Sequence, residues 1–383
     1  MAGSAETSMG GEKRAMKVGI LTLYYHNYNY GGQLQAYALC RFLNGLPDVT
    51  CEQISFCNPG NQKRKRSLKS LCFPLYSRLR HPLVFLKLYQ RKKRIESFSN
   101  QIPHSMPVDQ RALPFWVQQY DRIVVGSDQV WHPKYGNRCF FLDFLPEEKR
   151  GAYGASFGTD RFDTQWHKAA LSSLRKFNFL TVREKAAQQF LTEQGIWNAK
   201  VVCDPTLLLS REQWEKQLDK IPALIGPKTL FAYLLGDRQD TRQHIKNKAA
   251  AWGGRIASIP HIHFSYQKRD QNFGDVELYQ LGPREFLRLI RDATVIVTDS
   301  FHCTLFCILF EKNFWSVQRE PKEKDSTSNR QLTPLSKAGL TERFVPSAEH
   351  IDLYKSINYT GVKERLEPFI QQSRELLQTY FAH

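Results

Sequence analysis

Short apolar runs recur along the chain, and most of them end in a polar corner followed by a helical pattern. The run at 294–297 is a typical case: it predicts a buried strand, a polar corner follows at 299–302, and 304–310 predicts an apolar helix. Other strands are predicted at 17–23, 51–56, 121–126, 151–156, 179–183, 200–203, 229–235, 255–259 and 314–317. Other helices are predicted at 33–43, 184–194, 240–251, 283–292 and 361–381. This alternation favours an α/β fold with parallel sheets.

The alternation restarts after residue 205, which predicts two domains in a chain of 383 residues. We expect an N-terminal domain at 16–205 and a C-terminal domain at 206–350. The segment 351–383 is predicted as a helix that packs back over the domain junction. Residues 1–15 are small, polar and aperiodic, so we expect a disordered leader or tag there.

Composition narrows the class of protein. Hydrophobic residues make up 42% of the chain and aromatic residues 13%, as in globular proteins. No apolar run approaches the roughly 18 to 20 residues of a membrane span, and the start has no signal-peptide pattern, so a cytoplasmic protein is predicted. The eight cysteines form no CxxC pair, which predicts free and mostly buried thiols. His261 and His263 form an H-x-H pair without an evident third ligand, so we expect no metal and no cofactor.

The formal net charge of +17 predicts a negatively charged partner, whether phosphate, nucleic acid or anionic lipid. No acidic residue occurs between 53 and 95, and basic residues alternate with large apolar ones over 63–94. This pattern predicts a basic helical insertion at 60–100, a hairpin that can lie on an anionic membrane surface. A solvated basic face over an ordinary core is the alternative. RNA binding ranks last, because no RNA-recognition or helix-turn-helix signature accompanies the charge.

The corner after 294–297 carries Ser300 and His302. In a parallel sheet this corner lies at the carboxyl end of a strand, where the backbone N–H groups of the next helix favour an anion. The helix dipole favours the neutral ring of His302 and makes its protonated form a readier proton donor. Alternatively, Ser300 is only an N-cap and His302 only a packed or solvated ring.

Other corners repeat this arrangement. The first predicted strand leads into Gly31, Gly32 and Gln33, which present backbone donors to a phosphate or carboxylate or else form a structural turn. Arg183 is either a surface charge or an anion ligand at the end of another strand. The charged segment 319–329 predicts a mobile loop or lid.

The corner after 121–126 carries Ser127, Asp128, Gln129 and Trp131, and Trp131 is predicted to stack on a sugar. The loop after 151–156 begins with Ser156.

Taken in order, these pieces resemble the polysaccharide pyruvyl transferase family. The matching segments are VGILT at 18–22, NYGGQLQAYAL at 29–39, VGSDQVW at 125–131, ASFG at 155–158, VRE at 182–184, DPT at 204–206 and TDSFH at 298–302. The resemblance covers about 17–345. Two departures are Cys303, where the family often has glycine, and Arg330, which follows Ser328 and Asn329 in a loose match to a polar Ser-Arg step.

The resemblance implies two Rossmann-like domains in a GT-B arrangement with the active site in the cleft between them. It also implies transfer of the pyruvate moiety of phosphoenolpyruvate onto two hydroxyls of a sugar, giving a cyclic ketal and phosphate. His302 would then be the general acid, and Asp128 would accept a proton from a sugar hydroxyl or hold that hydroxyl. The expected substrate-binding residues are Gly31, Gly32, Gln33, Ser127, Gln129, Trp131, Ser156, Arg183, Ser300 and Arg330.

The expected partners are phosphoenolpyruvate, a bacterial surface-glycan precursor that is free or carried on a polyprenyl diphosphate, and an anionic membrane at the inner face of the plasma membrane. Two other functions stay open. A nucleotide-sugar glycosyltransferase would share the two-domain architecture and would release a nucleoside diphosphate. A non-catalytic glycan-binding or membrane-binding protein would use the basic segment and leave the cleft vestigial.

Overall fold

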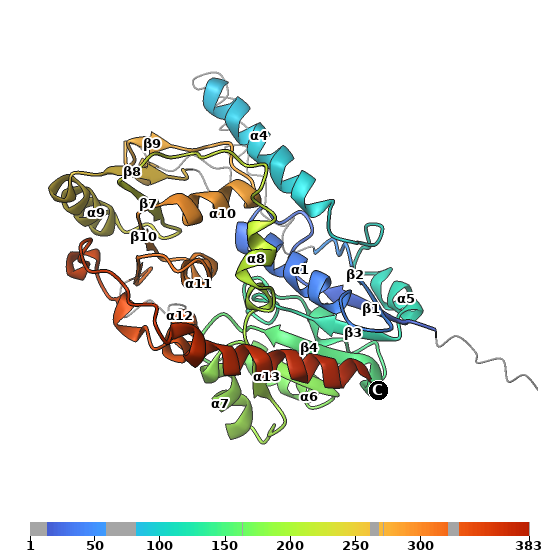
Figure 1. The fold of residues 1–383 in the computed structure, drawn as a ribbon. Helices are drawn as coiled ribbons and strands as arrows, with labels where there is room; N and C mark the ends of the chain where they lie inside the picture. The colour runs from blue at the N-terminus through green and yellow to red at the C-terminus, as the bar shows by residue number, and fades with distance from the viewer. Residues whose placement is uncertain are drawn as a thin grey trace, which may run out of the picture.

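Two parallel sheets of six strands each organise the molecule (Figure 1). The computed structural model describes residues 14–58, 82–162, 164–260, 268–270, 272–320 and 329–382. The predicted leader largely precedes these residues, and His261, His263 and most of 319–329 also lie outside them. The α/β alternation in the sequence is confirmed, because the paired strands within each sheet run parallel.

The first sheet has the order β2-β1-β3-β4-β5-β6. Its strands are β1 (Met16–Leu21), β2 (Val49–Gln53), β3 (Arg122–Val125), β4 (Arg150–Ala155), β5 (Phe179–Val182) and β6 (Lys200–Val201). The helices along this part of the chain are α1 (Tyr30–Leu43), α4 (Pro82–Ser99), α5 (Leu113–Trp116), α6 (Gln165–Leu174) and α7 (Lys185–Glu193).

The second sheet has the order β12-β11-β10-β7-β8-β9. Its strands are β7 (Thr229–Tyr233), β8 (Arg255–Ser258), β9 (Val276–Glu277), β10 (Val295–Thr298), β11 (Phe314–Val317) and β12 (Phe344–Val345). The helices from here to the end are α8 (Arg211–Glu215), α9 (Gln239–Trp252), α10 (Pro283–Asp292), α11 (Phe301–Leu309), α12 (Asn329–Ala338) and α13 (Val362–Ala382).

Each sheet has one place where the strand order reverses. In the first sheet the reversal lies between β1 and β3, and in the second between β7 and β10. Connections leave such a point in opposite directions, so the carboxyl ends of the two strands border an open crevice where ligands bind in parallel α/β proteins. Residues 31–33 lie in the first turn of α1 after β1, residues 127–129 follow β3, and residues 300–302 follow β10 at the start of α11.

The first turn of α1 departs from the prediction. We expected a loop through Gly31 and Gly32, but α1 begins at Tyr30 and includes both glycines. The Asn29 side chain caps this helix by accepting a hydrogen bond from the Gly31 N–H at 2.9 Å. Glycine disfavours a helix interior by about 1 kcal/mol relative to alanine, so the cap and tertiary packing decide the helix start here.

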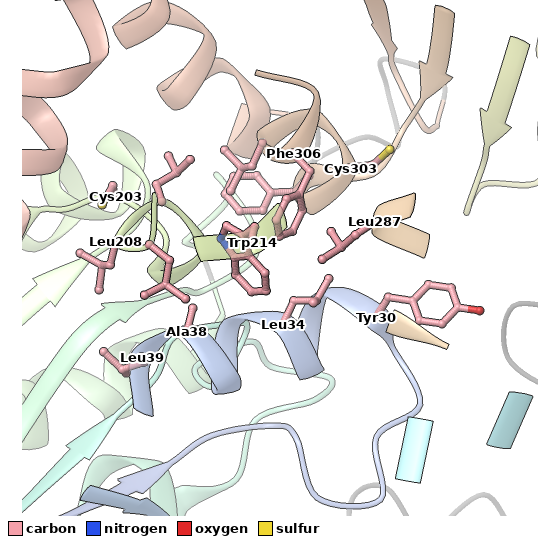
Figure 2. Close-up of a cluster of buried hydrophobic side chains, with 14 of the residues drawn as sticks. Tyr30, Leu34, Ala38, Leu39, Cys203, Leu208, Trp214, Leu287, Cys303 and Phe306 are labelled. Carbon is pink, nitrogen blue, oxygen red and sulfur yellow. The ribbon is translucent and has the colours of Figure 1, made fainter. Parts of the chain in front are cut away.

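A buried apolar cluster joins the two sheets (Figure 2). Leu34 and Ala38 on α1 face Trp214 of α8, and Phe306 of α11 packs on the indole with a ring-centroid separation of 5.1 Å. The ring of Tyr30 stacks on Phe286 at 4.9 Å, and its hydroxyl donates to the Leu281 carbonyl at 2.8 Å. These contacts fix α1 against α10 and α11, so the two crevices face a common region.

The last helix returns to the first sheet (Figure 1). Tyr380 near the end of α13 stacks on Phe179 of β5 with a centroid separation of 4.4 Å. Ser373 of α13 accepts a hydrogen bond from the Cys203 N–H at 3.0 Å. Because α13 also contacts α12, this helix ties the second half of the molecule to the first.

Only part of the basic insertion is described. The described part, from residue 82 onward, contains one helix, α4, and residues 59–81 of the predicted hairpin lie outside the described residues. Arg91 is the buried anchor of α4, and its guanidinium donates to the Pro260 carbonyl at 2.8 Å. Among the described residues no helix is both long and apolar enough to cross a bilayer.

Candidate active site

His302 lies in the first turn of α11, directly after β10. Ser300 is the N-cap of this helix, because its hydroxyl accepts a hydrogen bond from the Cys303 N–H at 3.4 Å. The His302 side chain is largely buried, and its Nε2 lies 3.5 Å from the Asp204 Oδ2. The N-cap therefore fixes the helix start, and the helix start aims the imidazole at a carboxylate from the other half of the chain.

Gly31 lets the imidazole approach α1. A Cβ built on Gly31 would lie only 2.1 Å from the Nδ1 of His302, so no other residue fits without moving the ring. A Cβ on the next residue, Gly32, would lie 3.5 Å from the Asp128 Oδ2. Consecutive residues of α1 thus lie beside His302 and beside Asp128. The fold brings these two predicted catalytic residues to one helix turn, although the sequence separates them by more than 170 positions.

Asp204 lies between His302 and Arg183. Its Oδ2 accepts a hydrogen bond from Arg183 Nη1 at 2.8 Å, and the Ser127 hydroxyl lies 3.4 Å away. Its Oδ1 accepts hydrogen bonds from the N–H and the hydroxyl of Thr206 at 3.0 and 2.8 Å. Burial acts to raise the pKa of Asp204, but His302 and Arg183 outweigh burial and hold this pKa well below its usual range. The carboxylate therefore stays charged beside the His302 ring.

Arg183 is buried and only partly paired. Its Nη1 bonds Asp204, its Nε lies 3.3 Å from Glu184 Oε1, and its guanidinium stacks 4.2 Å from the ring centre of Phe301. Burial acts to lower the pKa of Arg183, but Glu184, Asp204 and Asp128 outweigh it and raise the pKa. The buried Nη2 has no hydrogen-bond partner among the described residues. A desolvated donor of this kind is costly to leave unbonded, so an anionic ligand oxygen would suit it.

Arg330 adds positive charge from the first turn of α12. Burial lowers the pKa of Arg330 to about 10, and the like charges of Arg319 and Arg183 add to this shift. His132 feels the same field: burial and then Arg330 lower its pKa to about 4. Three guanidinium groups are close enough to disfavour one another's charge, which an anion between them would relieve.

Arg319 is a site residue that the sequence did not single out. It stands just after β11, and its guanidinium donates to the Asp299 carbonyl at 2.9 Å. The sequence places this residue at the start of the predicted loop or lid. The only sequence signal was its place beyond the carboxyl end of a strand, which it shares with Arg183.

Two predicted ligands have other roles. Trp131 is fully buried, its indole N–H donates to the Phe140 carbonyl at 3.1 Å, and its ring stacks on Phe141. The prediction that it stacks on a sugar is wrong, because the first domain's core covers the indole. Gln33 donates to the carbonyls of Tyr24 and Asn27 at 2.8 and 2.6 Å and accepts from Ser99. Its side chain holds the loop before α1, so its expected ligand role is replaced by a structural one.

The hydroxyls of Ser156 and Ser127 are buried and bonded to protein groups. Ser156 donates to Glu184 Oε1 at 2.6 Å, and Ser127 donates to the Gly154 carbonyl at 3.0 Å. They position Glu184 and the corner that carries Asp128. Gln129 is half-buried, and its amide packs against Gly158. The expectation that these side chains bind substrate stays a prediction.

No group of three or more metal-binding side chains occurs in the described part of the chain. The charged side chains that converge are instead His302, Asp128, Asp204, Glu184, Arg183, Arg319 and Arg330. This set can donate a proton, accept a proton and bind an anion with more than one negatively charged group.

Comparisons with known proteins agree with this picture. A family model described as polysaccharide pyruvyl transferase matches residues 29–321. Among solved structures, UDP-N-acetylglucosamine 2-epimerase from Rickettsia bellii is 10% identical with a TM-score of 0.51, and covers 96% of this chain and 98% of its own. The UDP-GlcNAc 2-epimerase from Methanocaldococcus jannaschii is 12% identical with a TM-score of 0.50 and 94% coverage of both chains. At this identity the likeness shows the fold alone, and it confirms two Rossmann-like domains in a GT-B arrangement. A search of curated proteins found no match.

Proposed function

The chain belongs to the polysaccharide pyruvyl transferase family, and from that premise we propose that it transfers the pyruvate moiety of phosphoenolpyruvate onto two hydroxyls of a sugar. The product would be a cyclic ketal on a bacterial surface-glycan precursor, and phosphate would be released. One observation carries the proposal: His302 and Asp128 lie beside consecutive glycines of α1, next to a cluster of buried arginines.

In this reaction the arginines bind the donor. Phosphoenolpyruvate carries a phosphate and a carboxylate, so it needs several cationic donors at once. Three arginines supply them: Arg183 just after β5, Arg319 just after β11, and Arg330 in α12. The unbonded Nη2 of Arg183 and the mutual repulsion around Arg330 favour a dianionic ligand over a neutral one.

His302 supplies the proton. Protonated His302 transfers a ring proton to C3 of phosphoenolpyruvate, which converts the methylene into a methyl group and leaves C2 electron-deficient. Asp204 stabilises the imidazolium before transfer, because its carboxylate lies 3.5 Å from the His302 Nε2. His302 here is a general acid, and Asp204 is a positioning residue that acts through it.

Asp128 accepts a proton from the acceptor sugar. One hydroxyl oxygen forms a bond to C2 while Asp128 accepts its proton, and then the bond between C2 and the phosphate oxygen breaks. The second hydroxyl adds to C2 and closes the ketal. Two hydroxyl protons are lost in total: Asp128 passes the first to the departing phosphate, and the second restores His302.

The donor decides between this proposal and a glycosyltransferase. We expect inorganic phosphate to form from phosphoenolpyruvate in proportion to ketal on a lipid-linked saccharide, with both products measured by mass spectrometry. The same protein should release no nucleoside diphosphate from nucleotide sugars. Release of the diphosphate with transfer of a sugar would overturn the proposal, and binding of glycan without turnover of either donor would indicate a non-catalytic protein.

We also propose that α4 places the enzyme on an anionic membrane at the inner face of the plasma membrane. The first half of this helix projects from the body of the molecule (Figure 1), with Leu83 73% and Leu86 52% exposed. Lys87, Lys92 and Lys93 are exposed along the same helix. Exposed apolar side chains flanked by lysines match the chemistry of an anionic bilayer surface, and such a surface would bring the site to a polyprenyl-diphosphate-linked acceptor.

Vesicle co-sedimentation tests this placement. Replacing both Leu83 and Leu86 with Ser should lower binding to phosphatidylglycerol-containing vesicles at least roughly tenfold, because about two apolar side chains no longer insert. Trp197→Ser is the matched control, since Trp197 is 76% exposed but lies away from α4. Equal vesicle binding by the double variant and the wild type would contradict the membrane role.

A further inference from the structure

A cavity separate from the cationic cluster lies in the first domain, beside the loop between β1 and α1. Its volume is about 540 Å³, within the roughly 300 to 1,000 Å³ typical of small-molecule pockets. Its walls are the loop itself, the C-terminal end of α4 and the segment 104–107, together with Gln33 of α1 and Ser55. None of its residues belongs to the cationic cluster described above.

The lining of this cavity suits a neutral polyhydroxyl ligand. Tyr24, Tyr25 and Tyr28 all face it, and the rings of Tyr25 and Tyr28 are half-buried. Side-chain amides and hydroxyls share the lining, among them those of Asn27, Asn100 and Ser99. Aromatic faces pack on the C–H face of a pyranose ring, while amides and hydroxyls bond its OH groups. The residues that line the cavity include no lysine or arginine, although the chain has a net charge of +17. The charged side chain of Glu96 lines the cavity and is paired with Lys92 at 3.7 Å, and a neutral ligand leaves this ion pair undisturbed.

The cavity adjoins the candidate catalytic residues. Asn27 lines it, and a Cβ on Gly32 would lie 3.2 Å from Asn27 Nδ2 and 3.5 Å from Asp128 Oδ2. The cavity wall and the proposed proton acceptor therefore meet at one turn of α1. Gln33, whose amide bonds the Tyr24 and Asn27 carbonyls, keeps the loop in this position.

We propose that this cavity binds a hexopyranose residue of the acceptor glycan, next to the sugar that receives pyruvate. The assignment rests on the proposed function for the identity of the acceptor. The assignment also gives both ends of α4 a role. Ile95, Glu96 and Ser99 at its C-terminal end form one wall of the cavity, and its exposed first half is the part proposed to contact the membrane. A lipid-carried glycan would run from the bilayer along α4 to the subsite and reach Asp128 with its next sugar.

Variants of the lining tyrosines test the subsite. Tyr25→Ala and Tyr28→Ala remove aromatic faces, Tyr28→Phe keeps the ring, and Tyr354→Ala is a control at a tyrosine that is 74% exposed elsewhere. The probe is a panel of p-nitrophenyl glycosides of disaccharides built from glucose, galactose and mannose, so that one sugar can receive pyruvate while the other occupies the cavity. Binding is measured by saturation-transfer NMR without phosphoenolpyruvate, and KM for both substrates is measured with it. Thermal unfolding checks that each variant is folded.

The alanine variants should weaken binding of the best panel member and raise its KM by roughly tenfold or more, with the KM for phosphoenolpyruvate unchanged. Tyr28→Phe should lose less than Tyr28→Ala because it keeps the ring, and Tyr354→Ala should behave like the wild type. Pyruvyl transfer with the same acceptor KM in all variants would overturn the subsite and leave the proposed function standing. Sugar binding that depends on Tyr25 and Tyr28 without any turnover of phosphoenolpyruvate would support the subsite and overturn the function. Panel binding that is absent from the wild type, or equal in all variants, would also overturn the subsite.

Discussion

Two aspartates occupy equivalent places in the two sheets, yet their hydrogen bonds differ. Asp299 follows β10, and both of its carboxylate oxygens accept backbone N–H groups, from Leu235 and Gly236, at 2.7 Å each. Asp128 follows β3, is half-buried, and bonds the backbone only through Oδ1, which accepts from Gln129 N–H at 2.9 Å. Its Oδ2 faces Gly32. A position at a strand end therefore predicts proximity to the site, and hydrogen-bond partners decide the role.

Loss of the proposed general acid, His302, should have the largest effect of the substitutions considered. His302→Ala is expected to lower kcat by roughly 10²- to 10⁴-fold, the range for losing a general acid, while phosphoenolpyruvate still binds. Steady-state kinetics with isothermal titration of phosphoenolpyruvate measure both quantities. His350→Ala, at an exposed histidine far along the chain, serves as the control. Turnover of the His302 variant within a few-fold of wild type would end the assignment.

The two aspartates can be compared directly. Asp128→Asn should lower kcat by about 10²-fold, because the amide cannot accept a proton, and should leave thermal stability nearly unchanged. Asp299→Asn should instead lower the free energy of unfolding by about 1 to 3 kcal/mol, because the amide NH₂ would face a backbone N–H that it cannot satisfy. Kinetics and denaturant unfolding of both variants give the answer. The same pattern of losses in both would remove the distinction between them.

The neighbouring glycines make a matched pair. Gly31→Ala should reduce kcat by roughly 10²-fold, because a methyl group at that point displaces the His302 ring by an ångström or more. Gly32→Ala requires only small adjustments around Asn27 and should retain most of the activity. Alanine favours a helix over glycine, so neither variant should melt α1. Equal activity of the two variants would mean that His302 does not need its place against α1.

Substitution of His132 should have the smallest effect, and that effect is on the free energy of unfolding. Its pKa is lowered to about 4 by burial and by Arg330, while the unfolded chain keeps a value near 6.5. Between these values the unfolded state binds more protons, so stability should fall as the pH drops from about 6.5 to about 4 and be flat above that window. Urea unfolding of His132→Asn across the window should show a shallower slope than wild type. An equal pH dependence of the unfolding free energy in the variant and the wild type would show that the pKa of His132 is not lowered in the folded protein.

Local sequence patterns predicted the fold and most of the site's location. The β-branched runs and the polar corners after them identified the strands and the loops that carry Asp128, Arg183 and His302, because period and turn chemistry are local properties. The alternation also predicted parallel sheets, which bring the carboxyl ends of strands to one edge.

Roles that depend on long-range packing could not be predicted in this way. Trp131 looked like an exposed aromatic because its corner is polar, but α6 and the 138–141 turn cover it. Asp204 looked like a turn residue, and only the tertiary structure places its carboxylate between Arg183 and His302. Arg319 and Gln33 differ from their predicted roles for the same reason, since their partners lie in other parts of the chain or on the far side of a loop.

The most direct test of the account is to run the reaction in D₂O and examine the pyruvate methyl group of the product by NMR and mass spectrometry. Protonation of C3 by His302, whose ring protons exchange with solvent, predicts one deuterium in that methyl group and phosphate released in equal amount. His302→Ala should slow the appearance of the deuterated product and of phosphate together. A ketal methyl group without deuterium, or release of phosphate at the wild-type rate from the His302 variant, would contradict the central claim.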